Sequence, residues 1–194
     1  MAEKMIDVHH HLWDLEEGSY GVFEEENLDE TALIGDYSPI RKNYLIDDLL
    51  ADFEGCNVVK SVHVQAEYTG ADQVWETAWL QGIADQHGYP HGIVAKTDLA
   101  SNTAPAELER HGEYRNMRGV RNFVQGEDLL TPEFRRGLQA LQDLGSRMTL
   151  IRPGKVWGVR AKQQICFRTF SSSWGTAECL WNGRRSTTET GWRD

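Results

Sequence analysis

Three consecutive histidines, His9 to His11, follow a short apolar run near the start of this sequence. Successive side chains of a β-strand point to opposite faces, so His9 and His11 share one face and His10 lies on the other. Two imidazoles on one face, at the carboxyl end of a strand, can bind a divalent metal or polarise a carbonyl group. A solvated loop and the remnant of a purification tag are the alternatives, although a tag usually carries a longer histidine run and no strand before it.

Further polar side chains stand where other predicted strands end. They are Gln65, Glu67, Lys96, Asp98, Arg121 and Gln125. Barrel enzymes of the (β/α)8 type keep their catalytic residues at the carboxyl ends of the strands. Each side chain also has a simpler interpretation: Arg121 could pair with an ordinary carboxylate, and Gln65 and Glu67 could be plain polar groups at a strand end. His63 alternates with two valines, which favours a buried interior residue over a metal ligand.

The composition describes a globular chain with an acidic balance. The 194 residues are 40% hydrophobic and 26% charged, with a formal net charge of −10. This charge makes nucleic acid and anionic membrane surfaces poor partners. Three separated cysteines indicate neither a disulfide framework nor a zinc finger. Because we find no apolar run of membrane-span length and no signal-peptide pattern, we expect a cytoplasmic protein.

Hydrophobic periodicity predicts an alternation of strands and helices. Predicted strands cover residues 5–9, 58–66, 92–96, 119–124 and 148–151. Predicted helices cover residues 47–53, 71–87, 103–110 and 131–144. Residues 14–43 are predicted to form a long solvated loop, and a lid over a site that uses Tyr20, Phe23 and Tyr37 is the alternative.

This alternation predicts an α/β fold with a parallel sheet and right-handed crossovers. An open doubly wound sheet and a (β/α)8 barrel both satisfy the pattern. The first predicted strand is followed by no glycine-rich phosphate loop, which favours the barrel.

Four segments together resemble the amidohydrolase-2 family of metal-dependent hydrolases, and in particular its lactonase branch. They are residues 6–14 (IDVHHHLWD), 62–67 (VHVQAE), 117–122 (MRGVRN) and 132–138 (PEFRRGL). The resemblance covers about residues 5–150 and implies a TIM barrel. Each motif is moderately specific, whereas their order and spacing together are highly specific.

The resemblance implies a hydrolase that acts on lactones of sugar acids or of aromatic-degradation products. It implies that His9 and His11 are catalytic groups and ligands of a divalent metal such as zinc, or purely electrostatic groups, because relatives differ in their need for a metal. It further implies that Arg121 holds a substrate carboxylate or carbonyl oxygen, with Trp13, Gln65 and Glu67 also binding substrate. A sister branch of the family catalyses decarboxylation, which leaves a decarboxylase-type relative as an alternative.

The composition changes near residue 150. Residues 1–150 hold 12 Lys and Arg against 27 Asp and Glu, whereas residues 151–194 hold 8 against 3 and contain no histidine. A (β/α)8 barrel needs about 250 residues, and the family's remaining site groups lie on its later strands. We therefore expect residues 1–150 to form the first four or five βα units of a barrel, and residues 151–194 to be an aberrant tail.

The genetic code suggests a frame shift as the origin of this tail. The third base of each codon, read with the first two bases of the next from Ser173 onward, can encode Val-Gly-His-Cys-Gly-Met-Pro. That peptide resembles the family's next histidine-bearing strand. An incomplete barrel leaves a sheet edge and apolar surface uncovered, so we expect the chain to be unstable or aggregation-prone and nearly inactive. A non-catalytic half-barrel that binds a metal or a partner is the other alternative, and the oligomeric state stays open.

Overall fold

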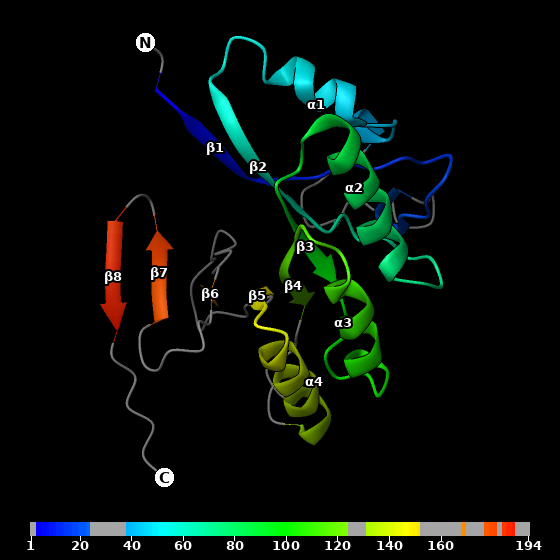
Figure 1. Cartoon of the computed structure of the whole chain (residues 1–194), viewed down its shortest axis with the longest axis vertical. Coiled ribbons are helices and arrows are strands. Elements are labelled where there is room, and N and C mark those ends of the chain that lie inside the picture. Colours follow the sequence, from blue (N-terminus) through cyan, green and yellow to red (C-terminus); the bar gives the residue numbers. More distant parts are fainter. Residues whose placement is uncertain are drawn as a thin grey trace. The chain divides into compact units, whose positions relative to one another are not determined.

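The structure is a computed structural model that describes residues 3–23, 38–123, 131–151, 168–169, 177–181 and 184–188. Its strands, apart from those of the tail, are β1 (Met5–His10), β2 (Val58–Val64), β3 (Gly92–Lys96), β4 (Met117–Phe123) and β5 (Arg147–Ile151). Its helices are α1 (Ile46–Asp52), α2 (Val74–His87), α3 (Ala104–Gly112) and α4 (Pro132–Asp143), and short 3-10 turns cover Gly21–Phe23 and Ser38–Ile40. The alternation of strands and helices expected from the sequence is therefore confirmed (Figure 1).

The chain divides into two compact units. The first comprises residues 1–96 and 110–118, and the second comprises residues 97–109 and 119–194. In the first unit β1, β2 and β3 are parallel and neighbours in sequence order, and the Ile93 N–H donates to the Asn116 carbonyl just before β4. In the second unit β4 and β5 are parallel. Parallel strands joined by helices are the expected α/β arrangement.

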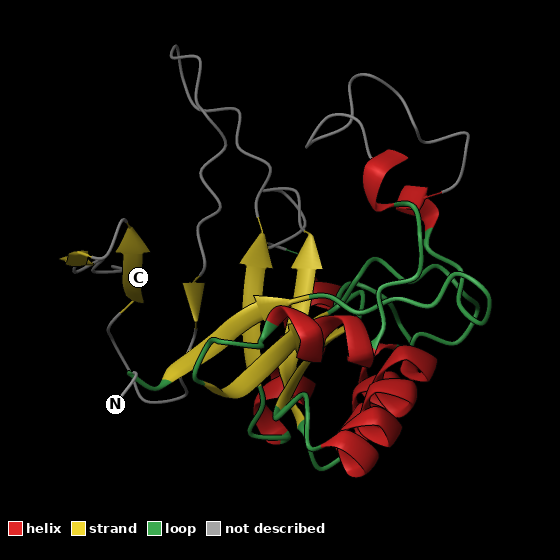
Figure 2. Ribbon diagram, turned by 90° about the horizontal axis from the view of Figure 1, so that it is seen from above, coloured by secondary structure: helices red, strands yellow, loops and turns green. Residues whose placement is uncertain are grey.

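The core of the first unit lies between its strands and two helices. Leu12 and Ile93 pack against Ile46 and Leu49 of α1 and Leu80 of α2. The helices drawn beside the strands in Figure 2 include α1 and α2, which supply this core, as the outer helices of a barrel do. Gly88, at φ +80°, ends α2 in the left-handed conformation that glycine adopts without steric cost.

The loop after β1 is only partly as expected. Tyr20 and Phe23 are buried in a cluster with Ala66 and Tyr68 just beyond β2, so the beginning of this loop is packed rather than solvated. The reason is aromatic burial, which removes large apolar areas from water. Residues 24–37 lie outside the described residues.

The tail after β5 contains β6 (Arg168–Thr169), which is antiparallel to β5, and the antiparallel pair β7 (Ala177–Trp181) and β8 (Arg184–Thr188). The division of the chain near residue 150 and the frame shift stay predictions. Among the described helices, none has the length and apolar character needed to cross a membrane.

In the second unit, α4 approaches the chain that follows β3. A Cβ atom built on Gly137 of α4 would lie 2.2 Å from the Leu99 carbonyl oxygen. The Thr131 hydroxyl accepts a hydrogen bond from the Phe134 N–H and caps the start of the same helix. Only glycine allows this close approach, so position 137 controls the packing of α4.

We therefore predict that Gly137→Ala lowers the free energy of unfolding by about 1–3 kcal/mol, the usual cost of overpacking a core. The matched control is Gly82→Ala in α2, where an added Cβ meets nothing within 4 Å. That change should stabilise the protein by up to about 1 kcal/mol, because alanine favours helix. Urea unfolding of the two variants measures both effects, and equal effects of the same sign would contradict the packing.

Candidate active site

The carboxyl ends of the first three strands lie at one level. His10 of β1 is opposite His63 of β2, and Val64 of β2 is opposite Val94 of β3. The Gln65 N–H continues this pairing by donating to the Val94 carbonyl at 2.8 Å. Because the strands are parallel, His11, Gln65 and Lys96 follow at the same edge of the sheet.

The structure brings His9 and His11 together at this edge. Their ring centroids are 5.0 Å apart and the rings meet edge to face. Nδ1 of His11 lies 2.6 Å from the Val64 carbonyl oxygen. A carbonyl oxygen only accepts hydrogen bonds, so Nδ1 carries the proton and Nε2 of the neutral ring keeps its lone pair. That nitrogen can bind a cation or accept a proton.

Two further histidines, His10 and His63, lie close to this pair. His63 is fully buried, with its ring centroid 6.1 Å from that of His11 and 5.7 Å from that of His10. Nδ1 of His10 lies 3.0 Å from Oδ2 of Asp7. Burial lowers the pKa of His10, although the neighbouring Asp7 carboxylate acts in the opposite direction. His10 is therefore a neutral, buried group near neutral pH.

A metal site needs more ligands than this pair provides. Catalytic zinc usually has three protein ligands and one open position. Within the described residues, no group of three His, Cys, Asp or Glu side chains is placed to hold an ion. The hydrogen bond of His11 to a backbone carbonyl is nevertheless the kind of outer contact that orients a metal-binding imidazole. His9 and His11 thus suit two positions of a metal site.

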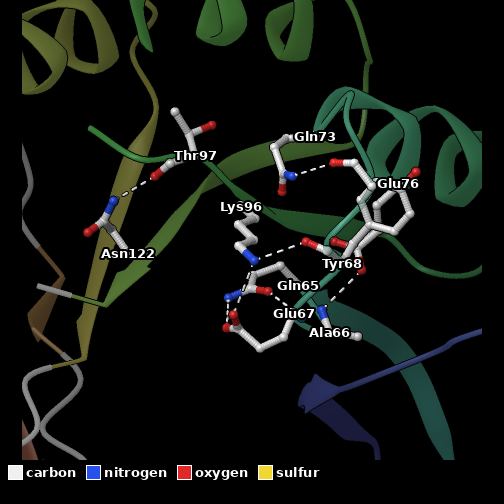
Figure 3. A network of polar contacts seen from close by, with 10 residues as sticks. Gln65, Ala66, Glu67, Tyr68, Gln73, Glu76, Lys96, Thr97 and Asn122 are labelled. Carbon is white, nitrogen blue, oxygen red and sulfur yellow. Dashed lines mark hydrogen bonds and ion pairs between the residues drawn. The ribbon is translucent and has the colours of Figure 1, made fainter. Parts of the chain in front are cut away.

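A polar network follows β2 and β3 (Figure 3). The Gln65 amide binds Glu67 twice: its nitrogen donates to Oε1, and its oxygen accepts the Glu67 N–H at 2.6 Å. The Lys96 ammonium lies 3.3 Å from Oε2 of Glu67 and donates to the Tyr68 carbonyl at 2.9 Å. Three side chains predicted to lie at strand ends, Gln65, Glu67 and Lys96, are therefore in direct contact.

Glu67 has an unusual backbone. Its φ of +62° is in the left-handed region, which costs a non-glycine residue about 1–3 kcal/mol. The surrounding side chains hold this bend, because the buried Glu76 of α2 accepts the Ala66 N–H at 3.0 Å and Gln65 accepts that of Glu67. Strain of this kind is typical of functional sites.

Trp13 and Arg121 are placed differently from the polar network. Trp13 packs against Phe23 and Tyr44, and its indole N–H donates to the Lys42 carbonyl at 2.6 Å. Arg121 is a buried residue of β4 in the second unit, where its neighbour Asn122 donates to the Thr97 carbonyl. The substrate-binding roles of Trp13 and Arg121 stay predictions, as do those of Gln65 and Glu67.

Sequence reasoning placed Lys96 at a strand end but left it out of the predicted site. Its position as the last residue of a predicted strand was the available signal. Glu76 was missed altogether, because a carboxylate within a helix normally indicates solvent exposure. Gln125, another strand-end residue, lies outside the described residues.

Comparison with known proteins identifies relatives along most of the chain. The family model described as Amidohydrolase matches residues 6–159. An uncharacterized protein of Sinorhizobium fredii, y4mH, is 38% identical over 153 residues, which cover 73% of this chain and 51% of that protein.

Two solved structures share the fold, each with a TM-score of 0.53. One is a probable 2-pyrone-4,6-dicarboxylic acid hydrolase of Acinetobacter baumannii with citric acid bound, which is 19% identical. The match covers 76% of this chain and 49% of that one. The other is an amidohydrolase of Burkholderia multivorans with bound zinc, which is 25% identical, and the match covers 74% of this chain and 47% of that one. The chain therefore spans about half the length of these relatives, as an incomplete barrel does.

A buried histidine supports the end of β3 and makes stability depend on pH. Nδ1 of His111 lies 2.9 Å from the Thr77 hydroxyl, and the ring makes a backbone hydrogen bond with Lys96. Burial lowers the pKa of His111 to about 4, and nearby Arg110 acts in the same direction. The Lys96 hydrogen bond and Asp72 oppose this shift.

Since the pKa of His111 is lowered on folding, the unfolded chain takes up a proton near pH 6.5 and the folded chain only near pH 4. The contribution of His111 to the free energy of unfolding is therefore fully present above pH 6.5, and it is lost as the pH drops toward 4. We predict a loss of about 3 kcal/mol from this group, at 1.36 kcal/mol per pKa unit. Urea unfolding at a series of pH values measures this effect. Between pH 6.5 and 4 the free energy of unfolding should fall less steeply with pH in His111→Asn than in the wild type. His87→Asn, at the exposed end of α2, is the control. An unchanged slope in His111→Asn would contradict the assignment.

Proposed function

Because the chain belongs to the amidohydrolase family, we propose that it carries the first part of a hydrolase site that opens a lactone by attack of water. The observation that carries this proposal is the His9 and His11 pair, with the tautomer of His11 set by the Val64 carbonyl. An imidazole nitrogen with a lone pair at a strand end is suited to take a proton from water or to bind a cation.

In the proposed reaction water attacks the acyl carbon of the lactone, the ring C–O bond breaks, and a hydroxy acid is released. Nε2 of His11 accepts the proton of the attacking water and passes it to the ring oxygen as the C–O bond breaks, and His9 lies beside it at the same strand end. Arg121 holds the carbonyl or carboxylate oxygen, as the family resemblance implies. These roles are chemically consistent, because positive charge near a developing oxyanion lowers the barrier.

A divalent cation, if the protein uses one, is proposed to bind His9 and His11. The orientation of His11 supports this, and so does the zinc bound to the Burkholderia multivorans relative. Such a cation would lower the pKa of a bound water and polarise the carbonyl. The metal-independent alternative relies on the two imidazoles and Arg121 alone.

The choice of a lactone rests on the family resemblance and directs the first assays. The name of the Acinetobacter baumannii structure specifies a pyrone, which is a cyclic ester, and that likeness supports the fold alone. Sugar-acid lactones are the second group to test. The cytoplasmic location is likewise a proposal, drawn from the composition.

A second candidate function is a non-catalytic half-barrel that binds a partner along β1. Three apolar residues of this strand are exposed: Met5 by 45%, Ile6 by 56% and Val8 by 68%. Exposed apolar groups on one strand favour contact with another surface. Analytical ultracentrifugation measures association of the chain through β1. Association that Val8→Lys reduces would favour this function over the first.

We further propose that residues 151–194 are translated out of frame. The family match ends at residue 159, and the charge balance changes near residue 150. Sequencing the DNA across codons 145–160 tests this proposal, since a missing or additional base there is expected. A clean frame in independent clones would favour the half-barrel.

We predict that the 194-residue chain opens lactones with little or no turnover, whereas a frame-restored chain turns over normally. A pH-indicator assay with 2-pyrone-4,6-dicarboxylate and sugar-acid lactones measures both. In the frame-restored chain, His11→Ala should lower kcat by about 100-fold or more, the usual contribution of a general base. His87→Ala is the matched control on an exposed helix end. Normal turnover by the 194-residue chain would contradict an incomplete site, and inactivity of both chains would contradict the hydrolase.

We also predict that Zn²⁺ stabilises the chain through His9 and His11. At ten times its dissociation constant the ion should add about 1.4 kcal/mol to the free energy of unfolding. His11→Ala should abolish the increase, whereas His87→Ala should leave it intact. A zinc effect that persists without both His9 and His11 places the ion elsewhere.

A further inference from the structure

We propose that Lys96 binds an anionic group of the substrate. In the absence of substrate, Glu67 forms an ion pair with the Lys96 ammonium, and the anionic group of the substrate displaces it. The inference rests on the proposed hydrolase function and assigns the recognition of a carboxylate on the lactone to Lys96 and Glu67.

The position of Lys96 is the first reason. It is the last residue of β3, and the strand register places it at the same edge of the sheet as His11. His11 is bonded to Val64, which is next in sequence to Gln65 of the polar network. The ammonium group is therefore located at the edge where the proposed chemistry occurs.

The surroundings of the ion pair are the second reason. The Lys96 and Glu67 side chains are 28% and 27% exposed, and Nζ lies 3.3 Å from Oε2. Three arginine–carboxylate pairs of the described residues, Arg110–Asp72, Arg115–Asp85 and Arg136–Glu133, are much more exposed. A partly buried ammonium attracts an anion more strongly than one in bulk water, and it is still accessible to a ligand.

The hydrogen bonds of the network make an exchange feasible. If Lys96 turns from Glu67 to a substrate carboxylate, Glu67 still has the Gln65 amide as a donor to Oε1, and Gln65 also holds the Glu67 N–H. Lys96 keeps its hydrogen bond to the Tyr68 carbonyl. The left-handed backbone of Glu67 is thus supported from the Gln65 side throughout (Figure 3).

Glu67 supplies the same chemical group as the proposed ligand. The Lys96 ammonium already forms an ion pair with a carboxylate in the structure, so a substrate carboxylate would make the same kind of contact. Competition between the two carboxylates has a consequence that a purely structural ion pair lacks. Removing the charge of Lys96 must weaken anion binding, whereas removing that of Glu67 must strengthen it.

Binding of citrate to the full chain tests this signature without depending on turnover. Isothermal titration calorimetry compares citrate with its neutral triethyl ester in the wild type, Lys96→Gln, Lys96→Arg and Glu67→Gln. We expect Lys96→Gln to weaken citrate binding at least tenfold, Lys96→Arg to retain it, and Glu67→Gln to strengthen it about threefold or more. Lys60→Gln, an exposed lysine of β2, is the matched control for net charge.

Citrate binding that is absent from the wild type, unchanged in Lys96→Gln, or weakened in Glu67→Gln would overturn the inference. If Lys96→Gln does not fold, as judged by circular dichroism, the strengthening in Glu67→Gln decides the matter. Failure of the hydrolase proposal is seen separately, as lack of lactone turnover by the frame-restored chain. Anion binding that follows Lys96 and Glu67 in such an inactive protein would support the anion site and reject the reaction.

Discussion

The hydrogen bond between His11 and the Val64 carbonyl is the interaction on which the site depends. It joins the chain just after β1 to the last residue of β2, and so links the ends of two parallel strands. The same contact determines which nitrogen of His11 carries the proton. One hydrogen bond therefore contributes both to the fold and to the chemistry, and the orientation of the His9 and His11 pair follows from it.

Burial controls the charge near this edge of the sheet. Burial lowers the pKa of His10 and also that of the fully buried His111. Neutral histidines add no positive charge to the site, so the attraction of an anion depends more on the Lys96 ammonium. His111 also supports the backbone of Lys96. The packing of the interior thus bears on the electrostatics of the proposed site.

The chain beyond β2 illustrates how a strained segment is held. Glu67 adopts a left-handed backbone, and contacts from Gln65, Glu76 and Lys96 surround the segment from residue 65 to 68. Because the contacts come from a helix, from the segment itself and from β3, the bend does not depend on any one of them. A carboxylate held in this way is well positioned to interact with Lys96.

The sequence by itself determined the order of strands and helices, because periodicity and helix-ending residues are local properties. It also indicated His9 and His11, since alternation along a strand is set by backbone geometry. It could not reveal the left-handed bend at Glu67: the segment continues the apolar pattern of β2, and the Glu76 contact with Ala66 comes from a helix ten residues away. The burial of Tyr20 and Phe23 and the pairing of Lys96 with Glu67 were likewise decided by tertiary structure, because both join residues from different elements whose proximity no local pattern encodes.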